Sequence, residues 1–266
     1  MDRYNLERME HMNPDETLPY ESSSAVMWTG KGDRLTVVGD HLGRLPSLKI
    51  LNAQPGEVVL DAGCGAGFIA RRLARDYKAK VFGCDRSPTM LSRAHEHETL
   101  EPLGIIYDEA DIATGLPYPS GSFDCVACVA VLIHDSPVEC RSFFREAYRV
   151  LKPGGRLIVS IMHPDLFQAD SPARTGQASW VQYETMEATP MTRSQQFAER
   201  YVDSEGNVFD SVVWYHPASL FPELLKKEGF VTTRAFHQPM TQDVLIACNA
   251  SGSIGYRAFY QVLATK

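Results

Sequence analysis

The chain has 266 residues and a mass of 29.6 kDa, which suits one large domain carrying an insertion. Its net charge of -7 at pH 7 disfavours nucleic acid and anionic membrane surfaces as partners, because both repel a negative protein. The sequence has no apolar run near the ~18 residues of a membrane-spanning helix and no signal-peptide core near Met1, so we expect a soluble, cytoplasmic protein.

The six cysteines do not follow the spacing of a disulfide framework. Cys125 and Cys128 form a C-x-x-C pattern, but they lie inside an apolar run that reads as a strand. Residues three apart on a strand point to opposite faces of the sheet. We therefore interpret both cysteines as core residues and predict no metal site.

The most informative stretch runs from residue 58 to residue 77. Residues 58–60 are apolar, and two of them are β-branched valines, as in a buried strand. Gly63, Gly65 and Gly67 then allow positive φ angles and remove the Cβ atoms that would keep a ligand from the backbone. Residues 68–77 have helix spacing. We expect a strand, a tight loop and a helix N-terminus whose free N–H groups favour electron-rich ligand atoms.

Two common nucleotide motifs do not fit this loop. The dinucleotide pattern G-x-G-x-x-G would need a glycine where the chain has Phe68, and no Gly-Lys-Ser/Thr follows. The D-x-G-x-G-x-G run from Asp61 to Gly67 instead resembles motif I of the class I S-adenosylmethionine (SAM)-dependent methyltransferases. The resemblance covers residues 35–266 in the order of elements and is tightest over 56–164.

The resemblance implies an α/β fold with a Rossmann-like, seven-stranded, mostly parallel sheet, helices on both faces and an antiparallel final strand. SAM would lie across the carboxyl ends of the first, second and fourth strands. The second strand, 80–85, ends at Asp85, which is placed to bind a ribose diol by its 24-residue offset from Asp61. Asp61 itself would face the ligand's ammonium group. Arg86 and Met90 are candidates for the rim and face of an adenine slot.

Further contacts with SAM are implied after the third and fourth strands. Asp111 and Ile112 match the acid and apolar residue that meet adenine in the family. The apolar run 125–133 predicts a central strand buried on both faces, and ligands collect at the carboxyl ends of such strands. Val129 and His134 are therefore cofactor-binding candidates, and His134 is also a candidate for catalysis.

Two segments depart from the minimal pattern. Residues 1–34 precede the first strand, and we interpret them as an N-terminal helical cap over the ligand, with Tyr20 as a contact; a surface arm without a role in binding is the alternative. Residues 163–214 form an insertion after the fifth strand, where a plain core needs only a short connection, and we interpret it as a lid. Within the lid, 196–202 and 208–215 suggest a hairpin.

The smaller elements also have sequence signals. Residues 35–53 predict one or two helices that break at Pro46, and Ser87 and Pro88 predict a capped helix start. A helix over 217–228 and a sixth strand over 230–236 follow the lid. For the final strand we choose 257–265 over 244–248.

The resemblance implies transfer of the SAM methyl group to a small molecule. His134, His163 or a lid tyrosine such as Tyr183 could take a proton from the acceptor. One alternative is an intramolecular cyclase that converts SAM into azetidine-2-carboxylate and methylthioadenosine, for which Asp203, Glu205 and Asn207 in the lid would orient and deprotonate SAM's own amine. A second alternative is a non-catalytic SAM-binding protein. A homodimer is compatible with the sequence.

Overall fold

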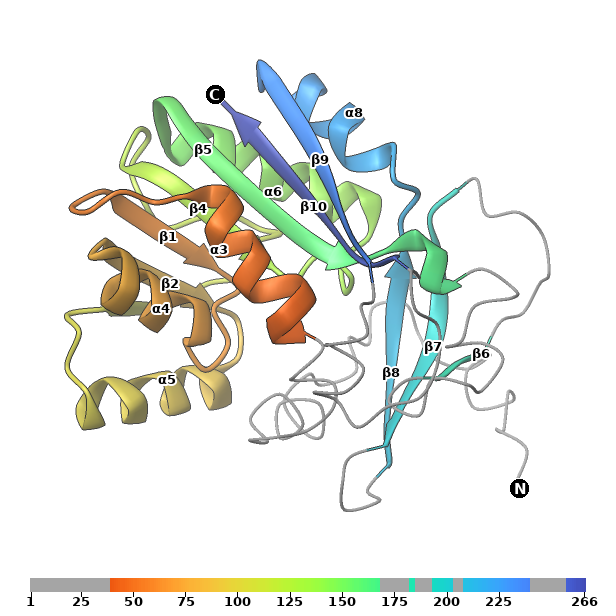
Figure 1. Ribbon diagram of the computed structural model, residues 1–266, viewed down its shortest axis with the longest axis horizontal. Coiled ribbons are helices and arrows are strands. Elements are labelled where there is room, and N and C mark those ends of the chain that lie inside the picture. Colours follow the sequence, from red (N-terminus) through yellow and green to blue (C-terminus); the bar gives the residue numbers. More distant parts are fainter. Residues whose placement is uncertain (1–38, 168–181, 185–192, 203–207, 240–256) are drawn as a thin grey trace.

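The structure, a computed structural model, describes residues 39–167, 182–184, 193–202, 208–239 and 257–266. Its main sheet has seven strands in the order β3-β2-β1-β4-β5-β10-β9 (Figure 1). The first five are mutually parallel, and β10 runs antiparallel to both β5 and β9. The predicted fold class is therefore confirmed. The strands are β1 (Val58–Ala62), β2 (Lys80–Asp85), β3 (Ile106–Glu109), β4 (Phe123–Val129), β5 (Leu151–Met162), β9 (Thr232–Pro239) and β10 (Arg257–Thr265).

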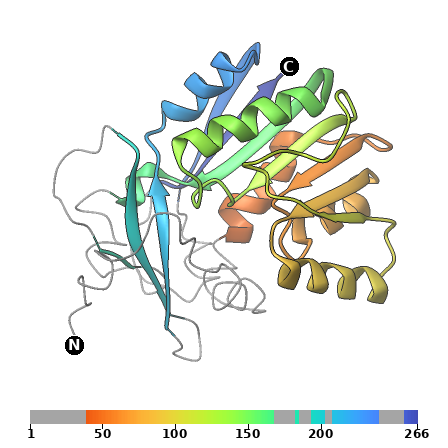
Figure 2. The same cartoon turned by 180° about the vertical axis from the view of Figure 1, so that it is seen from behind.

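Helices cover both faces of this sheet (Figures 1 and 2). On one face, α3 (Leu45–Leu51), α4 (Phe68–Tyr77) and α5 (Pro88–Leu100) bury their apolar stripes against one core cluster. On the other face, α6 (Pro137–Val150) and α8 (Leu220–Lys227) pack against a second cluster. A π-helical turn, η2 (Gly39–Arg44), leads directly into α3. None of the helices in the described part of the chain has the length and hydropathy needed to cross a bilayer.

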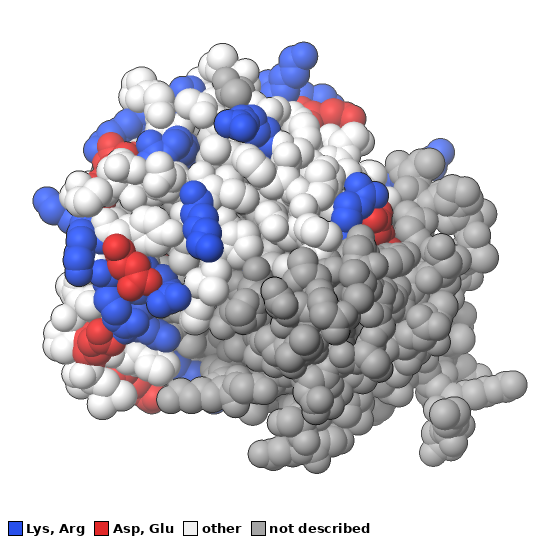
Figure 3. Space-filling model, in the orientation of Figure 1, with Lys and Arg blue, Asp and Glu red and all other residues white. Residues whose placement is uncertain are grey.

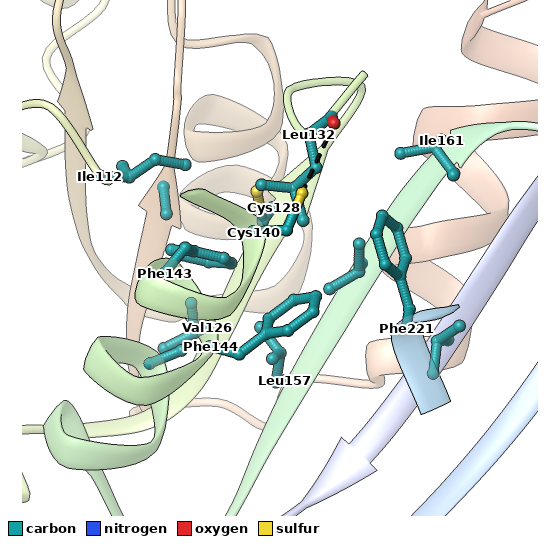
Figure 4. Packing of buried hydrophobic residues seen from close by; sticks show 14 of the residues in the cluster. Ile112, Val126, Cys128, Leu132, Cys140, Phe143, Phe144, Leu157, Ile161 and Phe221 are labelled. Carbon is teal, nitrogen blue, oxygen red and sulfur yellow. Dashed lines mark hydrogen bonds between the residues drawn. The ribbon is translucent and has the colours of Figure 1, made fainter. Parts of the chain in front are cut away.

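Residues 125–129 of strand β4 are all apolar because this strand is buried on both faces. Cys125 and Ala127 point into the cluster under α4, whereas Val126 and Cys128 point into the cluster under α6. Figure 4 shows Cys128 in the same cluster as Cys140 and Phe143 of α6. Cys125 and Cys128 are both buried free thiols on opposite faces, so the core interpretation of the C-x-x-C pattern is confirmed.

A separate three-stranded sheet stands between β5 and α8 in the chain, in the order β6-β7-β8. Its strands are β6 (Gln182–Glu184), β7 (Gln195–Val202) and β8 (Val208–Tyr215), and a 3₁₀ turn, η3 (Pro164–Phe167), leads into this part of the chain. The predicted hairpin is confirmed, with the pairing running from Gln195 opposite Tyr215 to Val202 opposite Val208. The ring of Phe167 packs on those of Phe197 and Tyr215, at centroid distances of 5.2 and 5.6 Å, which joins the sheet to the end of β5.

Several predicted boundaries were wrong. The fourth strand ends at Val129 and not at residue 133, because Ala130 has φ +61 and turns the chain into a loop over 130–136. Two helical segments, η2 and α3, do meet beside Pro46, at residues 44 and 45, but the chain is not broken there; Pro46 lies in the first turn of α3, where its missing N–H costs nothing. Helix α8 and strand β9 start a few residues later than predicted. The chosen final strand is confirmed as β10, and its competitor at 244–248 lies outside the described residues.

Candidate functional site

The carboxyl ends of β1, β2 and β4 lie side by side at one edge of the sheet, because these strands are neighbours and parallel. The loops that leave them bring together residues 61–67, 85–90 and 130–136. This is the edge at which open α/β sheets bind ligands.

The three glycines of the first loop all have positive φ: +74 at Gly63, +52 at Gly65 and +78 at Gly67. The space beside them is not open, however. A Cβ on Gly63 would lie 2.5 Å from Cγ2 of Val131, and a Cβ on Gly67 would lie 2.3 Å from Oη of Tyr107. The expectation that the missing Cβ atoms make room for a ligand is therefore wrong at these two positions, where protein side chains fill the room.

The amides of this loop are also used within the protein. The N–H groups of Gly63 and Cys64 donate to the carbonyl oxygen of Cys84, at 2.8 and 2.9 Å. The N–H of Gly65 donates to Oδ2 of Asp85 at 2.8 Å, and that of Gly67 donates to the oxygen of Cys64. These four loop amides are therefore engaged within the protein, whereas the predicted free N–H groups belong to the N-terminus of α4, which follows them. One of the four, the amide of Gly65, holds Asp85.

Asp61 is 2% exposed at the end of β1. Its Oδ2 accepts the N–H of Ala70 at 2.9 Å, which satisfies the first turn of α4 where the capping residue Gly67 has no side chain. Burial raises the pKa of Asp61 to about 7, the charge of Asp85 adds to the rise, and the charge of Arg44 opposes it. A buried acid of this kind gains from a cationic ligand group.

Asp85 is 7% exposed at the end of β2, and both of its oxygens accept backbone N–H groups. Oδ2 takes Gly65 and Oδ1 takes Ser87, at 2.8 and 2.9 Å. Ser87 in turn accepts the N–H of Met90 and caps α5, as its sequence predicts. Burial raises the pKa of Asp85, against the lowering effect of these hydrogen bonds. Each carboxylate oxygen has two lone pairs, so each can still accept a hydroxyl.

Arg86, the next residue, is exposed, and its charge acts on two residues of the loop after β4. The pKa of His134 is lowered to about 4, mainly by burial and also by the charge of Arg86, and a hydrogen bond with the backbone of Val212 opposes both. His134 is therefore a neutral imidazole at pH 7. Burial raises the pKa of Asp135 to about 7, and Arg86 opposes that rise.

The remaining predicted contacts lie in the same region. Met90 is buried, and its Cε is 3.2 Å from where a Cβ on Gly65 would be. Asp111 is partly buried and uses Oδ1 to accept the N–H of Ala113 at 2.9 Å. The side chains of Ile112 and Val129 are buried in the two core clusters, and Figure 4 shows Ile112 near Phe143.

His163, named from the sequence as a possible base, is not placed to act as one. Its Nδ1 accepts the N–H of Asp165 at 3.0 Å, and its Nε2 lies 2.8 Å from Nδ1 of His237. Burial lowers its pKa to about 4. Since both ring nitrogens are engaged within the protein, no lone pair is left for a substrate.

Five predicted residues cannot be placed. Tyr20, Asp203, Glu205 and Asn207 lie outside the described residues, as does the side chain of Tyr183. Sequence reasoning in turn missed Arg44, whose guanidinium lies 5.1 Å from the ring centroid of Phe68 and whose charge reaches Asp61. The sequence contains no motif that points to Arg44, because this residue lies in a helical turn before the first strand, outside the glycine-loop pattern.

Sequence reasoning also missed His216. His216 contacts the loop after β4, at the carbonyl oxygens of Leu132 and Asp135. This contact depends on how the preceding insertion folds, which local sequence patterns do not determine. Within the part of the chain that the structure describes, no group of three or more His, Cys, Asp or Glu residues is arranged to hold a metal ion.

Comparison with known proteins agrees with this geometry. Residues 59–155 match the family described as "Methyltransferase domain". The chain is 43% identical over 109 residues to the 2-methyl-6-phytyl-1,4-hydroquinone methyltransferase of Synechocystis sp., covering 40% of this chain and 32% of that protein. It is 28% identical over 174 residues to the 18S rRNA (guanine(1575)-N(7))-methyltransferase of Saccharomyces cerevisiae, covering 62% of this chain and 61% of that protein.

The fold has relatives among solved structures. A SAM-dependent methyltransferase from Mesorhizobium loti superposes with a TM-score of 0.58 at 21% identity, covering 83% of this chain and 96% of that one. Residues 59–155 are thus similar to a methyltransferase domain, and the fold is the one seen in this solved structure, in agreement with the motif resemblance. The matches span less than two thirds of the two curated relatives' own length.

Proposed function

We propose that the protein transfers the methyl group of SAM to a small molecule. The observation that carries this is the pair of buried acids, Asp61 and Asp85, at the ends of adjacent parallel strands, within the residues that match a methyltransferase domain. Asp85 is held by the glycine loop and Asp61 by the first turn of α4. When bound, SAM supplies an electrophilic methyl group on a sulfonium sulfur.

The charges of the site suit the groups that SAM presents. Asp61, raised in pKa by burial, gains from an ammonium group, and Arg44 provides a positive charge for the carboxylate beside it. Asp85 has acceptor capacity for the two ribose hydroxyls. Because these ligand groups are mainly hydrogen-bond donors, the site needs acceptors there, and the loop amides serve to orient Asp85.

Around the reacting atoms, the chain must hold the acceptor in line with the methyl carbon and sulfur and exclude water. His134 is neutral at pH 7 and can accept a proton, although a pKa of about 4 makes it a weak base. Tyr183, Asp203 and Asn207 of the insertion stay our further candidates, as does Tyr20 of the segment 1–34 for binding.

A small-molecule substrate, and not nucleic acid, is supported by the net charge of -7 and by the hydroquinone methyltransferase among the relatives. A cytoplasmic location and a role in small-molecule biosynthesis remain part of the proposal. On the described part of the face in Figure 3, basic side chains are dispersed and several lie beside acidic ones. A yeast rRNA methyltransferase is also a relative, so RNA belongs in the acceptor panel. A homodimer is compatible with this function and is tested by analytical ultracentrifugation.

One assay separates this proposal from its alternatives. Purified protein is incubated with SAM, with and without acceptors, and the products are identified by mass. S-adenosylhomocysteine that forms only with an acceptor supports methyl transfer. Methylthioadenosine without an acceptor would favour cyclisation, and SAM binding without turnover across the panel would favour a non-catalytic role. No contact in the described site favours either alternative.

Replacing Asp85 with Ala should weaken SAM binding by about 10- to 100-fold, because a charged acceptor for the ribose hydroxyls is lost. Asp108→Ala is a matched control, since Asp108 lies on the neighbouring strand β3 and bonds Tyr118 instead. Calorimetric titration with SAM measures both variants. An unchanged affinity for Asp85→Ala would place the ribose elsewhere.

A further inference from the structure

The end of β8 is tied to the loop that follows β4. The N–H of Trp214 donates to the carbonyl oxygen of Ile133 at 2.6 Å. Two residues on, Nε2 of His216 lies 3.2 Å from the oxygen of Leu132 and 3.1 Å from the oxygen of Asp135. Trp214 at the end of β8 and His216 just after it thus bind three carbonyl oxygens of the 130–136 loop, those of Leu132, Ile133 and Asp135.

These contacts fix the tautomer of His216. Carbonyl oxygens only accept hydrogen bonds, so Nε2 must carry the proton. In the neutral ring Nδ1 then has a lone pair, and it lies 3.1 Å from Oγ of Ser194, whose hydroxyl donates to it. His216 is 2% exposed, and its ring is parallel to that of Trp214, with an interplanar angle of 4°. The side chain is therefore fully oriented.

The loop 130–136, which His216 holds, contacts the glycine loop 63–67. Ala130 enters it in a left-handed conformation that a residue with a Cβ rarely adopts, so the loop depends on outside contacts to keep its path. The next residue, Val131, lies directly against Gly63. A displacement of residues 132–135 would therefore reach the glycine loop through Val131.

We propose that His216 is a positioning residue that couples the three-stranded insertion to the SAM site. It holds the loop 130–136 in the path that seats Val131 on Gly63, and in doing so it links ligand binding at the glycine loop to the order of β8. A ligand bound at Asp85 restrains the glycine loop through the Gly65 amide, and the loop restrains Val131. The restraint then passes through the carbonyls of Leu132 and Asp135, and strand β8 is stabilised. This inference rests on the proposed SAM site.

The Trp214 amide reports this coupling, because its exchange with solvent requires the bond to Ile133 to open. We expect S-adenosylhomocysteine at saturation to slow exchange at this amide by about fivefold or more in the wild type, the lower end of typical coupling between sites. In His216→Leu the ligand-dependent slowing should fall below about twofold. His216→Gln, whose amide can donate to both carbonyls, should retain most of it.

Two further variants separate coupling from plain stability. Val213→Ala removes buried packing from the same strand without touching the hydrogen bonds, so it should speed exchange in general but keep the ligand-dependent slowing. Ser194→Ala removes the partner of Nδ1 and should give an intermediate effect; it also serves if His216→Leu does not fold. Hydrogen–deuterium exchange measures all five proteins.

Calorimetric titration of the same samples with S-adenosylhomocysteine distinguishes a failure of the coupling proposal from a failure of the proposed SAM site. If the wild type binds S-adenosylhomocysteine but β8 is not protected, or if His216→Leu or Ser194→Ala keeps the full slowing, the coupling role of His216 is wrong while the SAM site stands. If the wild type does not bind it, the SAM site and this inference are both wrong.

Discussion

Asp61→Asn should make the folded protein more stable at pH 8 and at the same time weaken its binding of SAM. The pKa of Asp61 is raised by burial from 3.8 to about 7. In the unfolded chain the acid loses its proton near pH 4, whereas the folded protein retains it until about pH 7. Folding therefore becomes less favourable as pH rises through this window, and the neutral amide avoids that cost.

The expected gain is on the order of 2–4 kcal/mol at pH 8 and shrinks toward zero as the pH falls to about 4. Urea unfolding across this range measures it. Asn can still accept the N–H of Ala70, so the cap on α4 is kept. Affinity for SAM should fall about 10- to 100-fold, because the charge that meets the ammonium group is lost.

Asp124→Asn is the control of opposite sign. Burial raises the pKa of Asp124, but its bonds to Lys152 and to the N–H of Val58 outweigh this and lower it. Its charge therefore stabilises the fold above pH 4, and removing the charge should destabilise the protein at pH 8. Asp124 lies at the start of β4, far along the strand from the site, so SAM affinity should not change. An Asp61→Asn variant that binds SAM as well as the wild type would remove Asp61 from the site.

Gly67→Ala should cost about 2–5 kcal/mol of stability, with two separable causes. Its φ of +78 strains a residue with a Cβ by about 1–2 kcal/mol. The new Cβ would also lie 2.3 Å from Oη of Tyr107, and such overpacking costs about 1–3 kcal/mol. Loss of the loop geometry should weaken SAM binding as well.

Gly104→Ala isolates the backbone cause, because Gly104 has φ +77 but nothing within 4 Å of its Cβ position. Tyr107→Phe isolates the packing cause. The Tyr107 hydroxyl is buried without a hydrogen-bond partner among the described residues, so removing it should cost little alone. In the Gly67→Ala background, Tyr107→Phe should recover about 1–2 kcal/mol in denaturant unfolding. A Gly67→Ala cost no larger than that of Gly104→Ala would contradict the packing seen in this loop.

The positions of the sheet strands can be predicted from the sequence where the pattern of apolar side chains follows directly from burial. The unbroken apolar run of β4 is a consequence of burial on both faces, and the capping signal of Ser87 is a local one. The end of β4 could not be predicted, since the left-handed turn at Ala130 interrupts a run that stays apolar beyond it.

Within the site, the acids at the strand ends could be predicted from their spacing, but their partners could not. The loop amides turn to Cys84 and Asp85, and His163 pairs with His237, only once strands distant in sequence are brought together. The same holds for His216, which has no motif of its own and depends on how the insertion docks on the loop after β4.

A crystal structure of the protein with S-adenosylhomocysteine tests the central claim most directly. We predict the ribose hydroxyls within hydrogen-bond distance of the Asp85 carboxylate and the amino group beside Asp61. An adenosyl group bound away from both acids would contradict the account.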